Sequence, residues 1–122
     1  TVAECGGFLY LMQSLDGAEM AGVLPTSAHM TRRLQPFGYV TLTANRDNLL
    51  CEAGGQFLVH EFHYAQAVDN GTDFHAVKPN GRAWDCGFAS DTLYAGFPHL
   101  YFRAKTEIAA NFVRKCAERS EK

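Results

Sequence analysis

Cys5 is the strongest candidate nucleophile in the sequence. It lies in Glu4-Cys5-Gly6-Gly7, between a short apolar stretch and a segment whose apolar side chains recur at helical spacing. A strand, a sharp glycine-containing turn and a helix in this order are typical of a nucleophile elbow, which holds the reactive side chain on the turn. We expect glycine there because a side chain would collide with neighbouring backbone. A buried structural cysteine beside two glycines gives the same short pattern, so the motif alone leaves both interpretations open.

The position of Cys5 would favour attack on a carbonyl carbon. A helix N-terminus presents unpaired N–H groups and the positive end of the helix dipole, so we expect it to stabilise the thiolate. The N–H of Gly6 would point at the oxyanion that forms when the thiolate attacks. A thiol nucleophile also needs a base, which is most often histidine.

His99 is the best placed of the five histidines to act as that base. His29 and His75 occur among polar, loop-like residues and are most simply surface side chains. His99 follows Pro98, where an apolar strand breaks, and a histidine at a strand end could reach the neighbouring strand end that carries the elbow. From these residues alone, a partly buried structural histidine explains position 99 equally well.

His60 and His63 raise the question of a metal site. They lie in a predicted strand, whose alternation places Glu61 and His63 on one face and His60, Phe62 and Tyr64 on the other. Two imidazoles on opposite faces cannot hold one ion without a bulge, and the HExxH spacing of helical zinc sites is absent. We therefore predict no metal site.

Helices on both sides of a strand-rich region must position these side chains. Apolar spacing predicts a helix over residues 8–16 with Gly17 as its stop, and a single helical turn over residues 30–35. A final amphipathic helix begins at about residue 104. The apolar stripe of that helix is formed by Ile108, Phe112 and Cys116.

The middle of the chain has the period of two that indicates strands. Asn70-Gly71 and Asn80-Gly81 both predict hairpin turns, and together they suggest a β-meander. The expected strands cover residues 39–44, 56–64, 74–78, 84–88 and 93–102, the last interrupted at Pro98. The order of elements indicates a mixed α/β domain that spans residues 1–122.

Composition limits the classes of function. Of the 122 residues, 47% are hydrophobic and 20% charged, with a net charge of -2, as in a globular domain. No basic stripe suggests nucleic acid, and no apolar run is long enough to span a membrane. The four cysteines are widely spaced, so we expect reduced thiols and a cytoplasmic location.

Six segments of the chain, taken together and in this order, are similar to a known family. They are Ala3–Leu11, Gly22–Pro25, Met30–Gln35, Gly38–Val40, His60–Tyr64 and His99–Phe102. The ensemble resembles the C-terminal glutaminase domain of cobyrinic acid a,c-diamide synthase, from about residue 2 to the last helix. The His-Glu-Phe-His-Tyr element is its most specific part and favours this synthase over the related cobyric acid synthase.

The resemblance implies a fold and a reaction. The fold would be part of a class I glutamine amidotransferase domain, which is flavodoxin-like, with a mixed sheet, an elbow helix, a β-meander and a C-terminal helix. Cys5 would attack the carboxamide of glutamine and His99 would take the thiol proton. Because Tyr101 stands where many relatives have a carboxylate, the resemblance implies a Cys-His dyad. The glutamine pocket would be shaped by Gly6, Gly7, His60, Glu61, Phe62, His63 and Tyr64.

The resemblance also implies parts that these residues do not supply. The sequence contains no phosphate-binding GxxxxGK[ST] loop, so ATP and Mg²⁺ would bind a separate N-terminal domain. In that domain the ammonia would amidate the a and c carboxylates of a corrinoid acceptor. The strands before the elbow, with the second oxyanion donor, are also absent, and losing one such donor costs about 10²- to 10³-fold in rate. We therefore expect the chain alone to be weak or inactive.

Two further expectations concern an open sheet edge and an alternative, non-catalytic function. An edge without its neighbouring strands invites pairing with a second copy, so we expect a homodimer. The alternative function is a non-catalytic module that keeps the fold to bind a partner protein. An unrelated thiol hydrolase is a third hypothesis.

Overall fold

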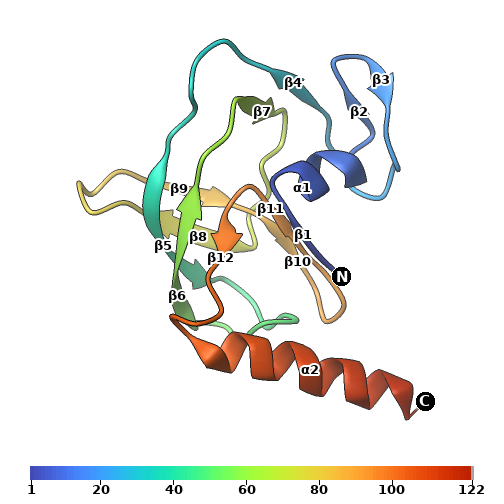
Figure 1. Ribbon diagram of the computed structural model, residues 1–122, viewed down its shortest axis with the longest axis vertical. Helices are drawn as coiled ribbons and strands as arrows, with labels where there is room; N and C mark the ends of the chain where they lie inside the picture. Colours follow the sequence, from blue (N-terminus) through green and yellow to red (C-terminus); the bar gives the residue numbers. More distant parts are fainter. Residues whose placement is uncertain (122) are drawn as a thin grey trace.

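Residues 1–121 form three small β-sheets and two helices, arranged as Figure 1 shows. These are the residues that the computed structural model describes, and Lys122, the last residue of the expected domain, lies outside the described residues. The predicted mixed α/β class is confirmed, because parallel and antiparallel strand pairs occur together with a helix near each end of the chain. In Figure 1 the long C-terminal helix lies below the sheets, and the short N-terminal helix lies above the first strand.

The first sheet carries the predicted elbow. Strand β1 (Val2–Glu4) pairs in parallel with β11 (Tyr94–Gly96), and β10 (Phe88–Ala89) pairs antiparallel with β11. Cys5 follows β1 directly, and helix α1 (Gly6–Leu11) follows Cys5, so the predicted strand, turn and helix are confirmed. Strand β1 is the outer strand of this sheet, so within residues 1–121 one side of its backbone has no strand partner.

Helix α1 ends at Leu11, so the prediction of a helix to residue 16 is wrong. The reason is the Asp16-Gly17 pair, whose φ values of 49° and 83° give the geometry of a two-residue hairpin turn. Gly17 therefore reverses a hairpin and does not stop a helix. The two strands of that hairpin are β2 (Ser14–Leu15) and β3 (Ala18–Glu19).

A five-stranded antiparallel sheet forms the middle of the molecule, in the order β12-β6-β5-β8-β9. The predicted alternation is confirmed in β5, where Val40, Leu42 and Ala44 are buried. The second predicted strand ends at Glu61 and not at residue 64. The strands are β5 (Gly38–Ala44), β6 (Gln56–Glu61), β8 (Phe74–Val77), β9 (Ala83–Cys86) and β12 (His99–Leu100).

A four-stranded sheet, in the order β3-β2-β4-β7, packs beside helix α1. In this sheet β4 spans Ala28–Met30 and β7 spans Ala65–Ala67. The helical turn predicted over residues 30–35 is wrong. The N–H of Thr31 donates to the carbonyl of Tyr64 at 2.6 Å, so the segment uses its backbone groups on a distant part of the chain and not within a helix.

The two predicted hairpin turns have different outcomes. Asn80-Gly81 joins the paired strands β8 and β9, as predicted. The prediction at Asn70-Gly71 is wrong, because β7 pairs with β4 and not with β8. Gly71 instead bridges to Gly87, and a Cβ on Gly71 would lie 2.2 Å from the Gly87 carbonyl oxygen. Glycine is therefore required there by a close approach of two backbones.

The strand predicted over residues 93–102 is divided between two sheets, as its proline suggested. Strand β11 lies beside the elbow strand, and β12 lies beside β6. Pro98 has no N–H to continue a ladder, so the chain leaves one sheet there and enters the other. His99 begins β12 and therefore lies at the junction of the two sheets.

Helix α2 (Thr106–Ser120) packs on the five-stranded sheet through part of its apolar stripe. Ile108 is buried and Phe112 is half-buried, whereas Cys116 is exposed. The predicted stripe is therefore covered only in its N-terminal part.

Candidate active site

Cys5 has a strained backbone. Its φ of 50° and ψ of -101° lie in a region that residues with a side chain rarely adopt. Such a conformation costs about 1–3 kcal/mol and persists where the surrounding structure fixes it, often at functional sites. Here the N–H of Cys5 donates to the carbonyl of Gly96 at 2.9 Å, and the N–H of Leu9 donates to the carbonyl of Cys5 at 3.0 Å.

The two glycines after Cys5 are not required by crowding, so the reason given above for them is wrong. A Cβ on Gly6 would meet no atom within 4 Å, and one on Gly7 would make ordinary contact with the Ala3 side chain at 3.4 Å. The strain resides in Cys5 itself. Gly6 is itself exposed to solvent.

The Cys5 thiol is protonated at rest. Burial raises its pKa and outweighs the hydrogen bond from the Gly6 backbone, and the nearby Glu4 and Glu61 carboxylates raise it further. The Gly6 N–H at the helix N-terminus favours the thiolate, as expected, but its effect is smaller than that of burial. The thiol donates a long hydrogen bond to the carbonyl of Phe62, with 4.0 Å between Sγ and oxygen. A thiol in this state needs a base before it can attack a carbonyl.

His99 lies at the strand end next to the elbow. The carbonyl that holds the Cys5 N–H belongs to Gly96, just before the turn that leads to His99. Nδ1 of His99 bonds to Oε2 of Glu4 at 3.0 Å, so the proton is on Nδ1 and the lone pair on Nε2. Within residues 1–121, Nε2 has no hydrogen-bond partner. The side chains of His99 and Glu4 are 44% and 25% exposed.

Glu4 is the residue that the sequence reasoning missed. Tyr101 is exposed, and within residues 1–121 it forms no hydrogen bond with the imidazole of His99. The sequence placed Glu4 at the end of the elbow strand, and a side chain there can reach the end of a neighbouring parallel strand. This position was the signal that could have identified Glu4 as a partner of His99. His99 therefore has a carboxylate partner that the expected Cys-His dyad did not include.

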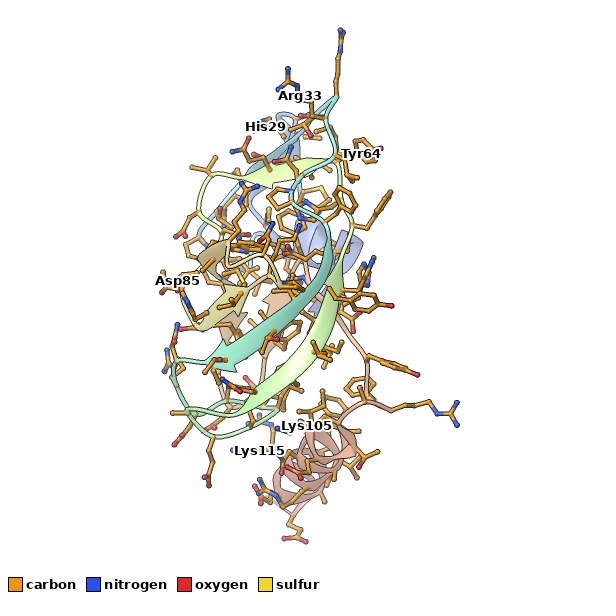
Figure 2. The ribbon with its side chains drawn as sticks, turned by 90° about the vertical axis from the view of Figure 1, so that its left-hand side faces the viewer. His29, Arg33, Tyr64, Asp85, Lys105 and Lys115 are labelled. Atoms are coloured by element: carbon orange, nitrogen blue, oxygen red, sulfur yellow. The ribbon has the colours of Figure 1, made fainter. Side chains whose placement is uncertain are left out.

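The predicted pocket residues 60–64 fall on two sides of the chain, as the alternation predicted. His60 is opposite His99 in the β6–β12 register and lines an apolar groove of about 450 Å³ with it. Phe62 and Tyr64 are exposed and contact each other edge to face, with 5.9 Å between ring centroids. Figure 2 shows Tyr64 near Arg33 and His29, at the opposite end of the molecule from helix α2.

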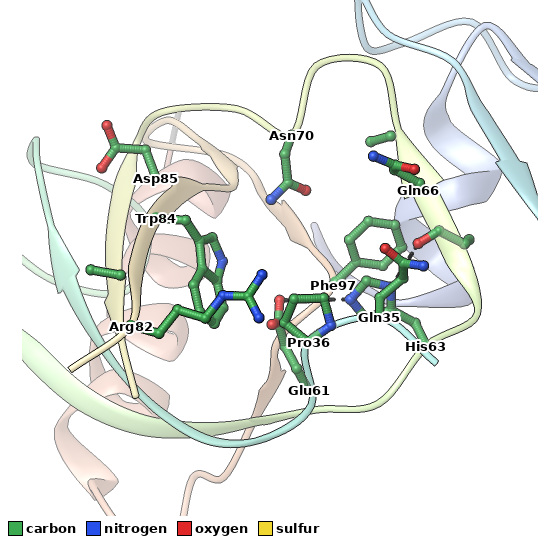
Figure 3. Close-up of a pocket in the computed structure, with 13 residues that line it drawn as sticks. Gln35, Pro36, Glu61, His63, Gln66, Asn70, Arg82, Trp84, Asp85 and Phe97 are labelled. Atoms are coloured by element: carbon green, nitrogen blue, oxygen red, sulfur yellow. Dashed lines mark hydrogen bonds and ion pairs between the residues drawn. The ribbon is translucent and has the colours of Figure 1, made fainter. Parts of the chain in front are cut away.

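Glu61 and His63 instead line an open pocket of about 410 Å³, drawn in Figure 3. Nε2 of His63 lies 3.9 Å from Oε1 of Glu61, and the His63 ring stacks on Phe97 with 3.7 Å between centroids. Burial raises the pKa of Glu61 to about 7, although Lys78 opposes the change. Burial also lowers the pKa of His63. Cys5 and His99 do not line this pocket.

Residues 1–121 contain no group of three or more His, Cys, Asp or Glu side chains that could hold a metal ion. None of the helices in the described residues is long and apolar enough to cross a membrane. His29 and His75 are exposed, as predicted.

Comparison with known proteins identifies relatives of one kind. The pattern of the CobB/CobQ-like glutamine amidotransferase domain matches residues 1–107. Cobyrinate a,c-diamide synthase of Methanothermobacter thermautotrophicus is 41% identical over 120 residues, which cover 94% of this chain and 27% of that protein. The Fusobacterium nucleatum enzyme of the same name is 38% identical, over 83% of this chain and 24% of that protein.

A third relative has a different name from the first two. Hydrogenobyrinate a,c-diamide synthase of Streptomyces coelicolor is 36% identical over 93% of this chain and 24% of its own length. The chain thus spans about a quarter of the length of these curated relatives. The extent of the domain match and these identities show that the chain belongs to the CobB/CobQ-like glutamine amidotransferase domain family.

Proposed function

We propose that Cys5 hydrolyses the side-chain amide of glutamine with His99 as its base, and that the ammonia serves an amidation. The observation that carries this proposal is the strained Cys5 next to Glu4, whose carboxylate bonds to Nδ1 of a histidine that has no partner on Nε2 in the described chain. A buried structural cysteine has no need of either feature. Strain of this kind is concentrated at functional sites.

In the first half of the reaction, Nε2 of His99 takes the thiol proton and the sulfur electron pair forms a bond to the amide carbon of glutamine. The N–H of Gly6 donates to the resulting oxyanion. When this intermediate collapses, the carbon–nitrogen bond breaks, and the imidazolium returns the proton to the leaving nitrogen. The products of this half are ammonia and a γ-glutamyl thioester on Cys5.

In the second half, water attacks the thioester carbon while Nε2 of His99 accepts a proton from it. The carbon–sulfur bond then breaks, the sulfur regains the proton from the imidazolium, and glutamate leaves. The sum is glutamine plus water giving glutamate plus ammonia. The raised pKa of the thiol makes the proton transfer to His99 necessary at neutral pH.

Glutamine would bind on the open side of the elbow. The accessible backbone of Gly6 and Gly7 and the Phe62 carbonyl near the thiol support a pocket between α1 and the end of β6. His60, near the end of this strand, and the exposed Phe62 and Tyr64, which follow the strand, would close over the substrate. Glu61 and His63 would shape the glutamine pocket only through their backbone, since their side chains line the separate pocket of Figure 3.

In a whole enzyme, the ammonia would be used by an ATP-dependent ligase that amidates the a and c carboxylates of cobyrinic acid. The names of the matched relatives support this acceptor, and ATP, Mg²⁺ and the corrinoid would bind outside this chain. The chain alone would be a weak or inactive glutaminase. The four cysteines carry free thiols, which supports a reducing compartment such as the cytoplasm.

A homodimer through β1 is part of the proposal. In the parallel β1–β11 pair, Thr1 and Cys5 bond to β11 through their backbones, so the backbone groups of Val2 and Glu4 face the open edge. Open edges pair readily with other strands. Sedimentation over a wide concentration range should show a monomer–dimer equilibrium, and a monomer at every concentration would refute this part.

Labelling with the glutamine analogue 6-diazo-5-oxonorleucine, located by mass spectrometry, tests the proposed function. We expect an adduct at Cys5 that excess glutamine prevents. Cys116 and Cys51 are internal controls, because both are free thiols outside the elbow and a general alkylating reagent should modify Cys116 first. An adduct at Cys116 or Cys51 alone would contradict the proposal, as would labelling of Cys5 that glutamine does not affect.

The alternative of a non-catalytic partner-binding module has one observation in its favour. Exposed aromatic side chains gather around the groove that contains His99, among them Tyr39 and Tyr101. Such a surface fits a protein partner. The labelling experiment separates the two functions, because a structural cysteine has no preference for a glutamine analogue over a general alkylating reagent.

A further inference from the structure

The carboxylate of Glu4 reaches the same histidine that serves the thiol next to it. Glu4 ends strand β1 in register with Gly96, and Cys5 follows it immediately. Oε2 of Glu4 lies 3.0 Å from Nδ1 of His99. One short piece of backbone thus carries both the nucleophile and the partner of its base.

The hydrogen bond decides what the imidazole can do. A carboxylate accepts only, so His99 must donate through Nδ1, and its lone pair is then at Nε2. The negative charge of the carboxylate next to Nδ1 also stabilises the imidazolium that forms when Nε2 takes a proton. Since Nε2 has no partner in residues 1–121, the ring is both oriented and available.

We propose that Glu4 is a positioning residue that acts through His99, so that the site is a Cys5–His99–Glu4 triad whose carboxylate precedes the nucleophile. This inference rests on the proposed glutaminase function. The position that supplies the carboxylate in many related sites, two residues after the histidine, is here the exposed Tyr101. Glu4 supplies the same chemistry from the neighbouring strand.

Glu4 has two opposite effects on the reactivity of Cys5, so the direction of the change in a variant tests the inference. As an adjacent negative charge, Glu4 raises the pKa of the Cys5 thiol. If this were its only effect, neutralising Glu4 would make Cys5 more reactive. If it acts through His99, neutralising it would make Cys5 less reactive, because the base is no longer held.

The experiment is a double-mutant cycle on the labelling rate of Cys5. The variants are Glu4→Gln and Glu4→Asp, each with His99 intact and with His99→Ala. We expect Glu4→Gln to lower the maximal rate with the diazo-ketone analogue by about tenfold or more, with little change in the half-saturating concentration, and Glu4→Asp to recover part of it. In the His99→Ala background, Glu4→Gln should leave the rate unchanged or increase it.

A matched control is available on the surface. His75 and Asp85 form a pair at 2.9 Å, far from Cys5 in the chain and outside the site, in which the histidine is as exposed as His99 and the carboxylate is more exposed than Glu4. Asp85→Asn removes the carboxylate from this pair and should leave the labelling of Cys5 unchanged. Circular dichroism of every variant confirms that it is folded.

Two results would overturn the inference. One is a Glu4→Gln variant that labels as fast as or faster than the original chain, and the other is the same slowing in the His99→Ala background, which would mark a purely structural role. If Glu4→Gln does not fold, long-range proton–nitrogen NMR of the unaltered chain decides, since the inference requires the Nδ1–H tautomer of His99.

Failure of the proposed function gives a different result. If the glutamine analogue does not label the unaltered chain, the cycle is repeated with iodoacetamide, which needs no glutamine pocket. Coupling of Glu4 to Cys5 through His99 would then support the triad while the glutaminase proposal fails. Labelling that glutamine prevents, without any coupling, would support the glutaminase and refute the triad.

Discussion

Two histidine–carboxylate pairs lie close to Cys5, and they differ in solvent access. His99 and Glu4 are 3.0 Å apart and their side chains are 44% and 25% exposed. His63 and Glu61 are 3.9 Å apart and their side chains are 9% and 3% exposed. Both pairs combine the same residue types, so composition and motif cannot separate them.

The environment gives each pair a different chemistry. Burial lowers the pKa of His63 and raises that of Glu61 to about 7, so both groups of this pair shift toward their neutral forms. A neutral pair with both side chains buried shapes the structure but is poorly suited to stabilise a thiolate. The pair at His99 is hydrogen-bonded and open to solvent, which suits a base that must exchange protons with substrate and water.

The largest expected effect separates the two histidines. His99→Ala should slow labelling of Cys5 by the diazo-ketone analogue by about 10²- to 10⁴-fold, the usual contribution of a general base. His63→Phe keeps a ring stacked on Phe97 and should change the rate only a few-fold. Labelling kinetics followed by mass spectrometry measure both. Equal losses in the two variants would remove the distinction between the pairs.

The next effect concerns the residue that joins the two regions. Phe97 is buried, stacks on His63 and lies between Gly96 and the turn to His99. Phe97→Ala should lower the free energy of unfolding by about 3–5 kcal/mol, as deletion of a buried ring does. Phe97→Leu fills more of the space and should cost less. Urea unfolding measures the difference, and an Ala variant as stable as the original chain would contradict the packing described.

The Glu61 carboxyl should make stability depend on pH. Its folded-state pKa of about 7 exceeds the ordinary 4.5, so the folded chain holds an extra proton between these values and loses stability as pH rises through them. Glu61→Gln lacks this penalty and should gain up to about 3 kcal/mol over the original chain between about pH 5 and about pH 8.

Unfolding by urea at both pH values tests this prediction. The lowered pKa of His63 has the opposite sign, since protonation at low pH destabilises the folded chain, and it largely cancels because both proteins contain His63. A stability difference that is independent of pH would show that Glu61 is not desolvated. A difference that grows toward low pH would show that it is ionised and stabilised in the folded chain.

The smallest effect on folding is expected at the elbow glycine. A Cβ on Gly6 meets no atom within 4 Å, so Gly6→Ala should change the free energy of unfolding by less than about 1 kcal/mol. The methyl group would lie where glutamine should approach, so protection of Cys5 by glutamine should weaken. Thermal unfolding and the protection assay measure the two effects, and a large loss of stability would contradict the open space at this turn.

The elements that the sequence predicted well are those with local causes. The elbow at Cys5, the alternation of β5 and the break at Pro98 depend on neighbouring residues, and each is confirmed. The helix over residues 8–16 was overestimated because helical spacing cannot show that Asp16 and Gly17 both adopt positive φ. The hairpin at Asn70-Gly71 was wrong because the pairing of β7 with β4 is a long-range choice.

The candidate site shows the same division between local and long-range causes. Cys5 and His99 could be proposed from motif and strand breaks. The contact of Glu4 with His99 joins residues 95 positions apart in the chain, so no spacing rule shows it. The burial that raises the Cys5 pKa likewise depends on the folded surroundings, so the sequence shows the effect of the helix terminus but not the larger effect of burial.

The measurement that tests the central claim most directly compares the two carboxylates in one assay. Glu4→Gln and Glu61→Gln are each reacted with the diazo-ketone analogue, and the rate of adduct formation at Cys5 is followed. We expect Glu4→Gln to slow labelling by about tenfold or more, and Glu61→Gln to leave it unchanged or faster, since both charges raise the thiol pKa but only Glu4 holds His99. Slowing by Glu61→Gln alone would contradict the assignment of the base to the His99–Glu4 pair.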